Sequence, residues 1–297
     1  MLYDIRAEIT YSYAVPAHST RQVLRLVPAD LDGRQRLISW SLESAPHPQE
    51  RDHGFDFFGN RTVLLRQNDP HSKLHLVMRA RVERFSEPLG LDISPPFDGL
   101  MREIASYRSI APQSPHHFLG ASPRLALEAP ITAYARALLR PTDTVLSYLK
   151  RLTAAVHADM SFDATATSVE TPPLEAFEKR HGVCQDFSQI TIAALRGLGI
   201  PAGYVSGYLR TLPPPGEKKL DGVDAMHAWV MAWCGLDMGW IAVDPTNNMV
   251  AGSDHVVVGV GRDYDDVSPV RGVSRFAGSH TTKQIVDVRQ VRDHAPA

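Results

Sequence analysis

Hydrophobic and polar residues alternate along much of the first 85 residues of the chain. Between residues 4 and 13, hydrophobic side chains occupy the odd positions and polar side chains the even ones. A period of two is typical of a β-strand with one buried and one solvated face. Further strand-like runs, separated by turn-forming residues, lie at 21–28, 36–42, 61–67 and 73–85. Short strands spaced in this way predict an antiparallel β-sandwich over residues 1–90.

The pattern becomes helical in the next third of the chain. Residues 87–100, EPLGLDISPPFDGL, are rich in proline and glycine and are typical of a linker. Helical spacing follows in residues 131–139 and 143–160, and Asp143 is the expected N-cap of the second run. Its apolar stripe recurs at i, i+4, i+7 and i+11 and consists of Val145, Leu149, Leu152 and Val156. We therefore expect a helical segment over residues 91–160 that leads into the last part of the chain.

The stretch RHGVCQDFSQI, residues 180–190, places a cysteine at a predicted helix start. Apolar residues follow Cys184 at helical spacing, and Gly199 and Pro201 suit the end of that helix. Unpaired N–H groups and the positive end of the helix dipole gather at such a start, where they favour a thiolate over a thiol. The same N–H groups can stabilise an oxyanion. The alternative is a buried structural cysteine.

A histidine and an aspartate lie on a predicted hairpin downstream. HAWVMAWC and GWIAVDPT read as strands joined by the turn GLDMG, with His227 and Asp244 at their open ends. An aspartate beside an imidazole fixes its tautomer and supports its charged form. If Cys234 faces Trp240, Asp244 falls about three residues short of His227, so a bulge or a different register is needed. Taken singly, His227 could be a core histidine and Asp244 a turn residue.

Other side chains are candidates for substrate or metal binding. Tyr208, Trp229 and Asn247 fall near the expected cleft and are candidate substrate contacts, although packing in the core is the alternative for Trp229. A zinc site of His181, Cys184, His227 and Cys234 is disfavoured. In an extended strand His227 and Cys234 point to opposite faces, and the chain has no CxxC pair. No metal site is predicted.

Composition narrows the class of protein. The chain has 297 residues, 43% of them hydrophobic and 22% charged, with a formal net charge of −2. These values are typical of a soluble globular protein and give no indication of nucleic-acid or membrane binding. The two cysteines, Cys184 and Cys234, form no disulfide framework, and the first residues lack the pattern of a secretory signal. We expect a cytoplasmic protein.

Several motifs together resemble bacterial transglutaminase-like proteins of the papain-like cysteine-enzyme superfamily. They are GVCQDF, LRGLGIPAGYVSGYL, HAWV, GWIAVDPTNN and GRDYDDVSPVRG, with YSYAVPAHSTRQVLRLVP and DFFGN in the N-terminal part. The resemblance implies an α+β chain with a transglutaminase-like, papain-like catalytic core over residues 161–297. It also implies that Cys184 is the nucleophile, His227 the general base and then acid, and Asp244 the residue that orients it.

The resemblance implies acyl transfer at an amide bond of a peptide or protein substrate through a thioester intermediate. Hydrolysis is slightly favoured, and the alternatives are an amine-transferring transglutaminase or amide-forming acyltransferase and a catalytically silent peptide-binding module. No calcium-loop pattern of the D-x-[DN]-x-[DN]-G type is present, and no cofactor is expected. The sequence leaves open the oligomeric state and whether the proline-rich loop 211–224 gates the cleft.

Overall fold

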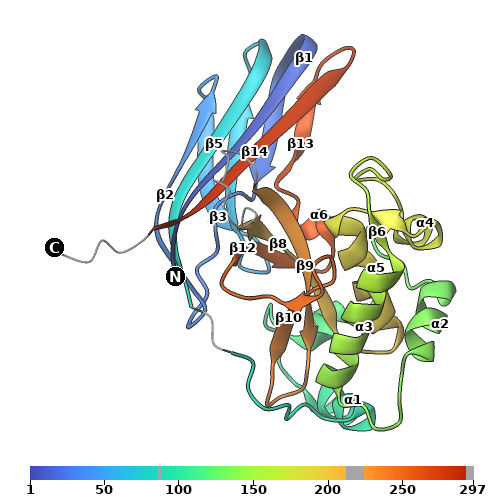
Figure 1. Cartoon of the computed structure of the whole chain (residues 1–297). Helices are drawn as coiled ribbons and strands as arrows, with labels where there is room; N and C mark the ends of the chain where they lie inside the picture. The colour runs from blue at the N-terminus through green and yellow to red at the C-terminus, as the bar shows by residue number, and fades with distance from the viewer. Residues whose placement is uncertain (86–87, 212–223, 292–297) are drawn as a thin grey trace, which may run out of the picture.

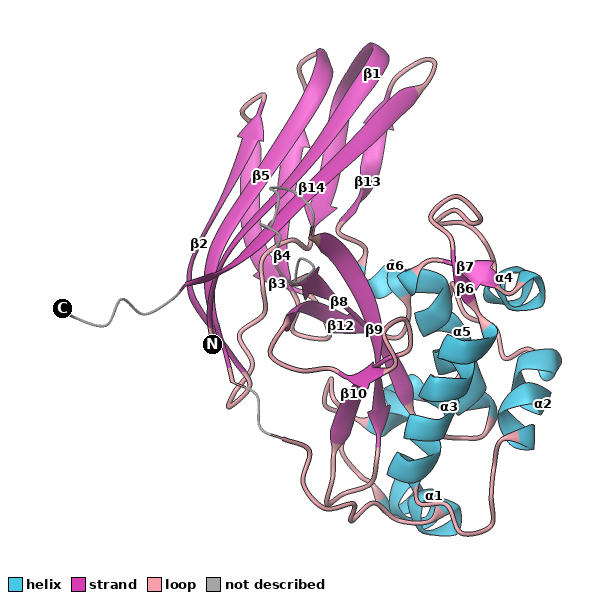
Figure 2. Cartoon of the chain, in the orientation of Figure 1, coloured by secondary structure: helices cyan, strands magenta, loops and turns pink. Residues whose placement is uncertain are grey.

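The computed structural model describes residues 1–85, 88–211 and 224–291. Long antiparallel strands from both ends of the chain form one part of the molecule, and helices packed on a second, smaller sheet form the other (Figure 1). Figure 2 shows that the helices gather on one side of the smaller sheet, away from the long strands. The α+β fold class predicted from the sequence is confirmed.

The first sheet is organised around β1 (Leu2–Leu24), one long strand that covers the first predicted strand run and the first four residues of the second. The first half of β1 pairs with β5 and β14, and its second half pairs with β4 and β13. The partners and edge strands are β2 (Gln35–Ala45), β3 (Glu50–Phe55), β4 (Arg61–Gln67), β5 (His71–Arg84), β13 (Val270–Arg275) and β14 (His280–Val291). Because β1 is shared, the predicted sandwich is one curled sheet of seven strands.

The alternation of the first strand decides which face of this sheet is buried. Tyr3, Ile5, Ala7 and Ile9 are each at most 2% exposed, and their polar neighbours lie on the opposite, solvated face. The domain boundaries differ from the prediction at the other end of the chain. Residues 270–291 were assigned to the catalytic core, but β13 and β14 pair with β1 and complete the N-terminal sheet.

The helical segment contains three α-helices and one short 3₁₀ helix, and its predicted stripe on α3 is buried. The elements are α1 (Phe97–Ser106), η1 (Pro115–Phe118), α2 (Ala129–Ala137) and α3 (Val145–Asp159). The predicted N-cap was wrong by one residue. Thr144 caps α3 by accepting from the Ser147 N–H, whereas Asp143 is buried and binds both terminal nitrogens of Arg151, at 2.5 and 2.7 Å. Asp143 therefore forms an ion pair with Arg151.

The second sheet has the strand order β11-β10-β9-β8-β12, and α5 (Cys184–Gly197) packs on one face of it. Its strands are β8 (Ala202–Leu209), β9 (Ala225–Trp233), β10 (Trp240–Asp244), β11 (Met249–Val250) and β12 (His255–Gly261). The remaining elements are β6 (Ser161–Phe162), α4 (Pro173–Lys179), β7 (His181–Gly182) and α6 (Tyr264–Val267).

The two faces of this sheet have different partners. Ala228 and Val230 pack against α5, whereas Trp229 packs on the opposite face with Ala29 from the N-terminal part. Tyr208 and Val256 join the core of the first sheet. Apolar contacts in two separate clusters therefore join the two parts of the molecule. Most of loop 211–224 lies outside the described residues, and no helix in the described ranges is long and apolar enough to cross a membrane.

Candidate active site

Cys184 is the first residue of α5, as the sequence predicts, and its side chain is half-buried. The turn before it is held by Asp186, whose carboxylate accepts from the Val183 N–H at 2.8 Å and from the Thr167 hydroxyl at 2.6 Å. Asp186 is fully buried, and that burial raises its pKa. A Cβ on Gly182 would lie 2.5 Å from a carboxylate oxygen of Asp186, so only glycine fits there. This local packing fixes the direction in which the helix presents its sulfur.

His227 and Asp244 meet across the hairpin of β9 and β10. Nε2 of His227 lies 2.8 Å from Oδ2 of Asp244. The sequence-based register was wrong by one residue, because Trp240 pairs with Trp233 and Val243 pairs with Val230. The next residue after that pair, Asp244, therefore faces Trp229 and shares the sheet face of His227. No bulge is needed to bring the carboxylate to the imidazole.

The carboxylate of Asp244 has no exposed surface and accepts five hydrogen bonds. Oδ1 accepts from the backbone N–H groups of Thr246 and Asn247, at 2.9 and 3.1 Å. Oδ2 accepts from the Asn247 side chain at 2.7 Å and lies 3.0 Å from Nε2 of His255. Burial raises the pKa of this carboxyl, but the hydrogen bonds from His227, His255 and Asn247 outweigh it and leave the pKa well below its usual range. Asp244 is therefore ionised at neutral pH.

His227 interacts with Asp244 on one side and with the Cys184 thiol on the other. Burial lowers the pKa of His227, yet its hydrogen bond to Asp244 and its interaction with Cys184 raise that pKa to about 9. Because Nε2 faces the carboxylate, Nδ1 is the ring nitrogen left for the sulfur. The structure thus brings the three side chains together, and it favours a charged imidazolium between a carboxylate and a sulfur.

The predicted substrate contacts are placed less favourably. Tyr208 is fully buried, and its hydroxyl donates to the Leu26 carbonyl at 2.7 Å. Trp229 is 1% exposed and stacks on His227 with 6.1 Å between ring centroids. Burial leaves neither side chain open to a substrate, so both predictions are corrected to packing roles. Asn247 is exposed but already donates to Asp244, and its contact with a substrate stays a prediction.

Sequence reasoning missed His255. The signal was present, because His255, like His227, begins a run of apolar strand residues. Its side chain is 1% exposed, and its ring lies edge-on to Trp229 with 5.2 Å between centroids. The strand β12 pairs with β8, which also pairs with β9, so the two histidines come from nearby strands of one sheet.

Among the described residues, His227, Asp244 and His255 have potential metal-ligand atoms within 4.8 Å of one another. Both ring nitrogens already lie at hydrogen-bond distance from one carboxylate oxygen, so a metal would have to displace those contacts. The zinc set considered from the sequence is not assembled. Cys234 is buried with its sulfur toward the Ala232 carbonyl, and His181 is exposed beside the Lys179 carbonyl.

Comparison with known proteins agrees with this architecture. The family model for the transglutaminase-like superfamily matches residues 132–245, and that for the bacterial transglutaminase-like N-terminal region matches residues 3–83. An uncharacterized protein of Mycobacterium tuberculosis is 33% identical over 81% of this chain and 77% of its own. The chain belongs to the transglutaminase-like superfamily. An uncharacterized protein of Mycobacterium leprae is 28% identical over 95% of this chain and 96% of its own.

A solved structure supports the fold of this transglutaminase-like chain. The crystal structure of a proposed cysteine protease from Cytophaga hutchinsonii matches with a TM-score of 0.76 and 21% identity. The match covers all of this chain and 93% of the other, so the N-terminal sheet and the core occur together in both. The superfamily match at residues 132–245 includes Cys184, His227 and Asp244, and it ends before His255.

Proposed function

We propose that this transglutaminase-like protein is a thiol-dependent acyl-transfer enzyme that acts on amide bonds through Cys184, His227 and Asp244. The observation that carries the proposal is the position of His227, between the sulfur of Cys184 and the ionised carboxylate of Asp244. A histidine with a pKa raised to about 9 holds its proton at neutral pH, and an adjacent imidazolium favours the thiolate form of a cysteine.

The proposed reaction begins when the Cys184 sulfur attacks the carbonyl carbon of an amide and forms a C–S bond. The proton on Nδ1 of His227 passes to the amide nitrogen, the C–N bond breaks, and the amine leaves. A thioester on Cys184 remains. Water or a second amine then attacks the thioester, His227 accepts the proton of that nucleophile, and the thiolate departs.

The helix start supplies the remaining requirement of this reaction. The first N–H groups of an α-helix lack the usual i−4 partner, and Cys184 is the first residue of α5, so such groups lie close to its backbone. A carbonyl oxygen that becomes negatively charged under attack would accept hydrogen bonds there. Asp186, through its bond to the Val183 N–H, keeps this end of the helix in place.

Hydrolysis of a peptide or isopeptide bond is slightly favoured over transfer to an amine. The name of the Cytophaga hutchinsonii structure, a proposed cysteine protease, supports hydrolysis, whereas the superfamily name supports transfer. A silent peptide-binding module is less favoured, because binding alone does not require an ionised carboxylate buried beneath an imidazolium. A cytoplasmic location is also part of the proposal.

Iodoacetamide labelling tests the nucleophile, and Cys234 serves as an internal control. Burial raises the pKa of the Cys234 thiol to about 12, so it should react slowly at every pH below 9. Cys184 should be alkylated much faster at pH 6–7, and equally slow labelling of both cysteines would contradict the proposal. Incubation of a peptide library with and without an added amine, read by mass spectrometry, separates hydrolysis from transfer.

A further inference from the structure

We propose that His255 is a positioning residue that fixes the charge and the direction of Asp244 and connects the N-terminal sheet to the site. The inference rests on the proposed function, because it concerns how the carboxylate serves His227. Nε2 of His255 lies 3.0 Å from the same Oδ2 that binds His227, and the His255 side chain is 1% exposed.

The contacts of His255 define which ring nitrogen carries its proton. The backbone N–H of Gly252 donates to Nδ1 of His255 at 3.2 Å. A nitrogen that accepts an N–H bond carries no proton of its own, so the proton lies on Nε2 and is donated to Asp244. His255 is therefore neutral, with a single tautomer imposed by the backbone. A charged His255 would require Nδ1 to meet the Gly252 N–H with a second proton.

A neutral hydrogen-bond donor stabilises a buried carboxylate and leaves its negative charge available to interact with another group. Asp244 is fully buried, so each of its hydrogen bonds offsets part of the cost of removing the charge from water. His255 supplies one such bond without neutralising the charge, which remains available to His227. In the proposed reaction His227 gains and loses a proton, whereas the bond from His255 stays the same throughout.

The charged groups around His255 come from several elements. Asp244 lies on β10 and His227 on β9, with 6.2 Å between the rings of His227 and His255. The neighbouring Asp254 points away from this cluster, because its carboxylate pairs with Arg210 at 2.7 Å and accepts from the Tyr3 hydroxyl at 3.0 Å. Asp244 is therefore the anion that His255 binds.

The hydrogen bonds continue from His255 into the N-terminal sheet. The carbonyl of Gly252, whose N–H binds His255, accepts from a terminal nitrogen of Arg84 at 3.1 Å. Arg84 is the last residue of β5, is 8% exposed and also donates to the Arg34 carbonyl. Hydrogen bonds thus connect Arg84 on β5 to Gly252, Gly252 to His255, and His255 to Asp244. It gives the N-terminal sheet a route by which it can position the proposed catalytic histidine.

The test compares variants of His255 by the rate at which iodoacetamide alkylates Cys184 at pH 7. His255→Leu removes one of the five donors to Asp244, so the carboxylate is held less firmly behind His227, and alkylation should slow by about 10- to 100-fold. His255→Gln offers an N–H at a similar reach and should restore most of the rate. His71→Leu is the matched control, because His71 is a histidine of the N-terminal sheet that is 7% exposed and contacts the Asp69 carbonyl. It should leave the rate unchanged.

Nitrogen NMR of the histidine rings in the unmodified protein gives a second measurement that does not depend on how the variants fold. The single proton of the His255 ring should lie on Nε2, because Nδ1 accepts from the Gly252 N–H. A proton on Nδ1 of His255 would overturn the inference.

The two proposals fail in different ways. Slow alkylation of Cys184 in the unmodified protein would contradict the proposed function itself. Fast alkylation that is equally fast in a folded His255→Leu variant would leave the proposed function intact and refute the role of His255.

Discussion

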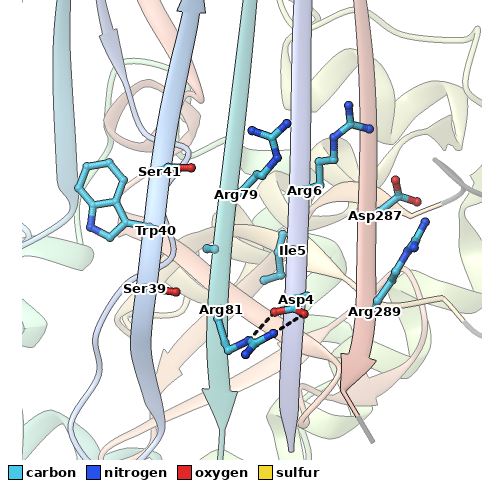
Figure 3. A pocket seen from close by; sticks show the side chains of 11 residues that line it. Asp4, Ile5, Arg6, Ser39, Trp40, Ser41, Arg79, Arg81, Asp287 and Arg289 are labelled. Carbon is cyan, nitrogen blue, oxygen red and sulfur yellow. Dashed lines mark hydrogen bonds and ion pairs between the residues drawn. The ribbon is translucent and has the colours of Figure 1, made fainter.

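Two regions of this molecule contain carboxylates in close contact with basic side chains, and they differ in their access to water. On the outer face of the N-terminal sheet, Arg81 binds Asp4 through two hydrogen bonds of 2.7 Å (Figure 3). The side chains of that pair are 46% and 48% exposed. At the candidate site, His227 and Asp244 are 7% and 0% exposed. Water can replace either partner of the first pair, but neither partner of the second.

The exposed region also contains a hollow of about 570 Å³, lined by residues such as Arg79, Trp40 and Arg289. It is lined by four arginines and two aspartates, and Arg79, which lies beside Arg6 on the neighbouring strand, pairs with Glu43 at 2.7 Å. The hollow therefore carries more basic than acidic side chains, and it is lined by none of the three proposed catalytic residues. The comparison teaches that burial around a charged group, rather than the size of a hollow, distinguishes the proposed functional centre of this chain.

The largest expected effect is that of Cys184→Ala, which removes the proposed nucleophile. Turnover of a peptide substrate should fall to the background rate, because no thioester can form. The thermal midpoint should change little, since the Cys184 side chain is only half-buried. Mass spectrometry of products, with calorimetry as the control for folding, makes the measurement. Retained turnover would place the nucleophile elsewhere.

The next effect is that of Asp244→Asn, which keeps the shape of the side chain and removes its charge. In either orientation the Asn N–H₂ group faces donors that now bind Asp244, and the neutral amide no longer supports the charged ring of His227. We expect kcat to fall by about 10³- to 10⁴-fold. Steady-state kinetics on the same substrate provides the check, and a loss smaller than tenfold would show that the charge of Asp244 is dispensable.

The pH dependence follows from the raised pKa of His227. Its folded-state value of about 9 lies above the ordinary 6.5, so the charged ring stabilises the folded protein fully below pH 6.5. That contribution is lost as the pH rises through 9. The value of kcat/KM should also fall as the pH rises through 9, because the imidazolium that protonates the leaving amine is lost. A kcat/KM profile that falls near pH 6.5 instead would contradict this assignment.

The smallest expected effect is that of Arg81→Gln combined with Asp4→Asn on the exposed face. Both side chains remain solvated without each other, so the thermal midpoint should change by no more than about 1 °C. Alkylation of Cys184 should be unchanged. A fall in either quantity comparable to that of Asp244→Asn would remove the distinction between the two regions.

Local signals in the sequence predicted much of this architecture. The period-two alternation of β1 and the helix start at Cys184 depend on residues close together in the chain, and both were confirmed. The hairpin was predicted, but its register was not. The turn is closed by the bond from the Cys234 N–H to the Gly239 carbonyl, with both Gly235 and Gly239 at positive φ, and no alternation rule specifies that geometry.

The sequence patterns could not predict contacts between segments that are distant in the chain. The pairing of β14 with β1 joins the two ends of the described chain, and either strand alone is compatible with several partners. His255 acquires its significance only because β12 and β10 lie in one sheet. The burial of Tyr208 likewise depends on the N-terminal part, whose Leu26 carbonyl accepts its hydroxyl. Tertiary packing therefore decided which polar residues reach the site.

The protonation state of His227 tests the central claim most directly. In the unmodified protein at pH 7.5, nitrogen NMR should find both ring nitrogens of His227 protonated, and Cys184→Ala or Asp244→Asn should each lower the pH at which the ring loses its proton. A His227 ring that is neutral at pH 7.5 and insensitive to both substitutions would contradict the claim that sulfur, imidazole and carboxylate act as one unit.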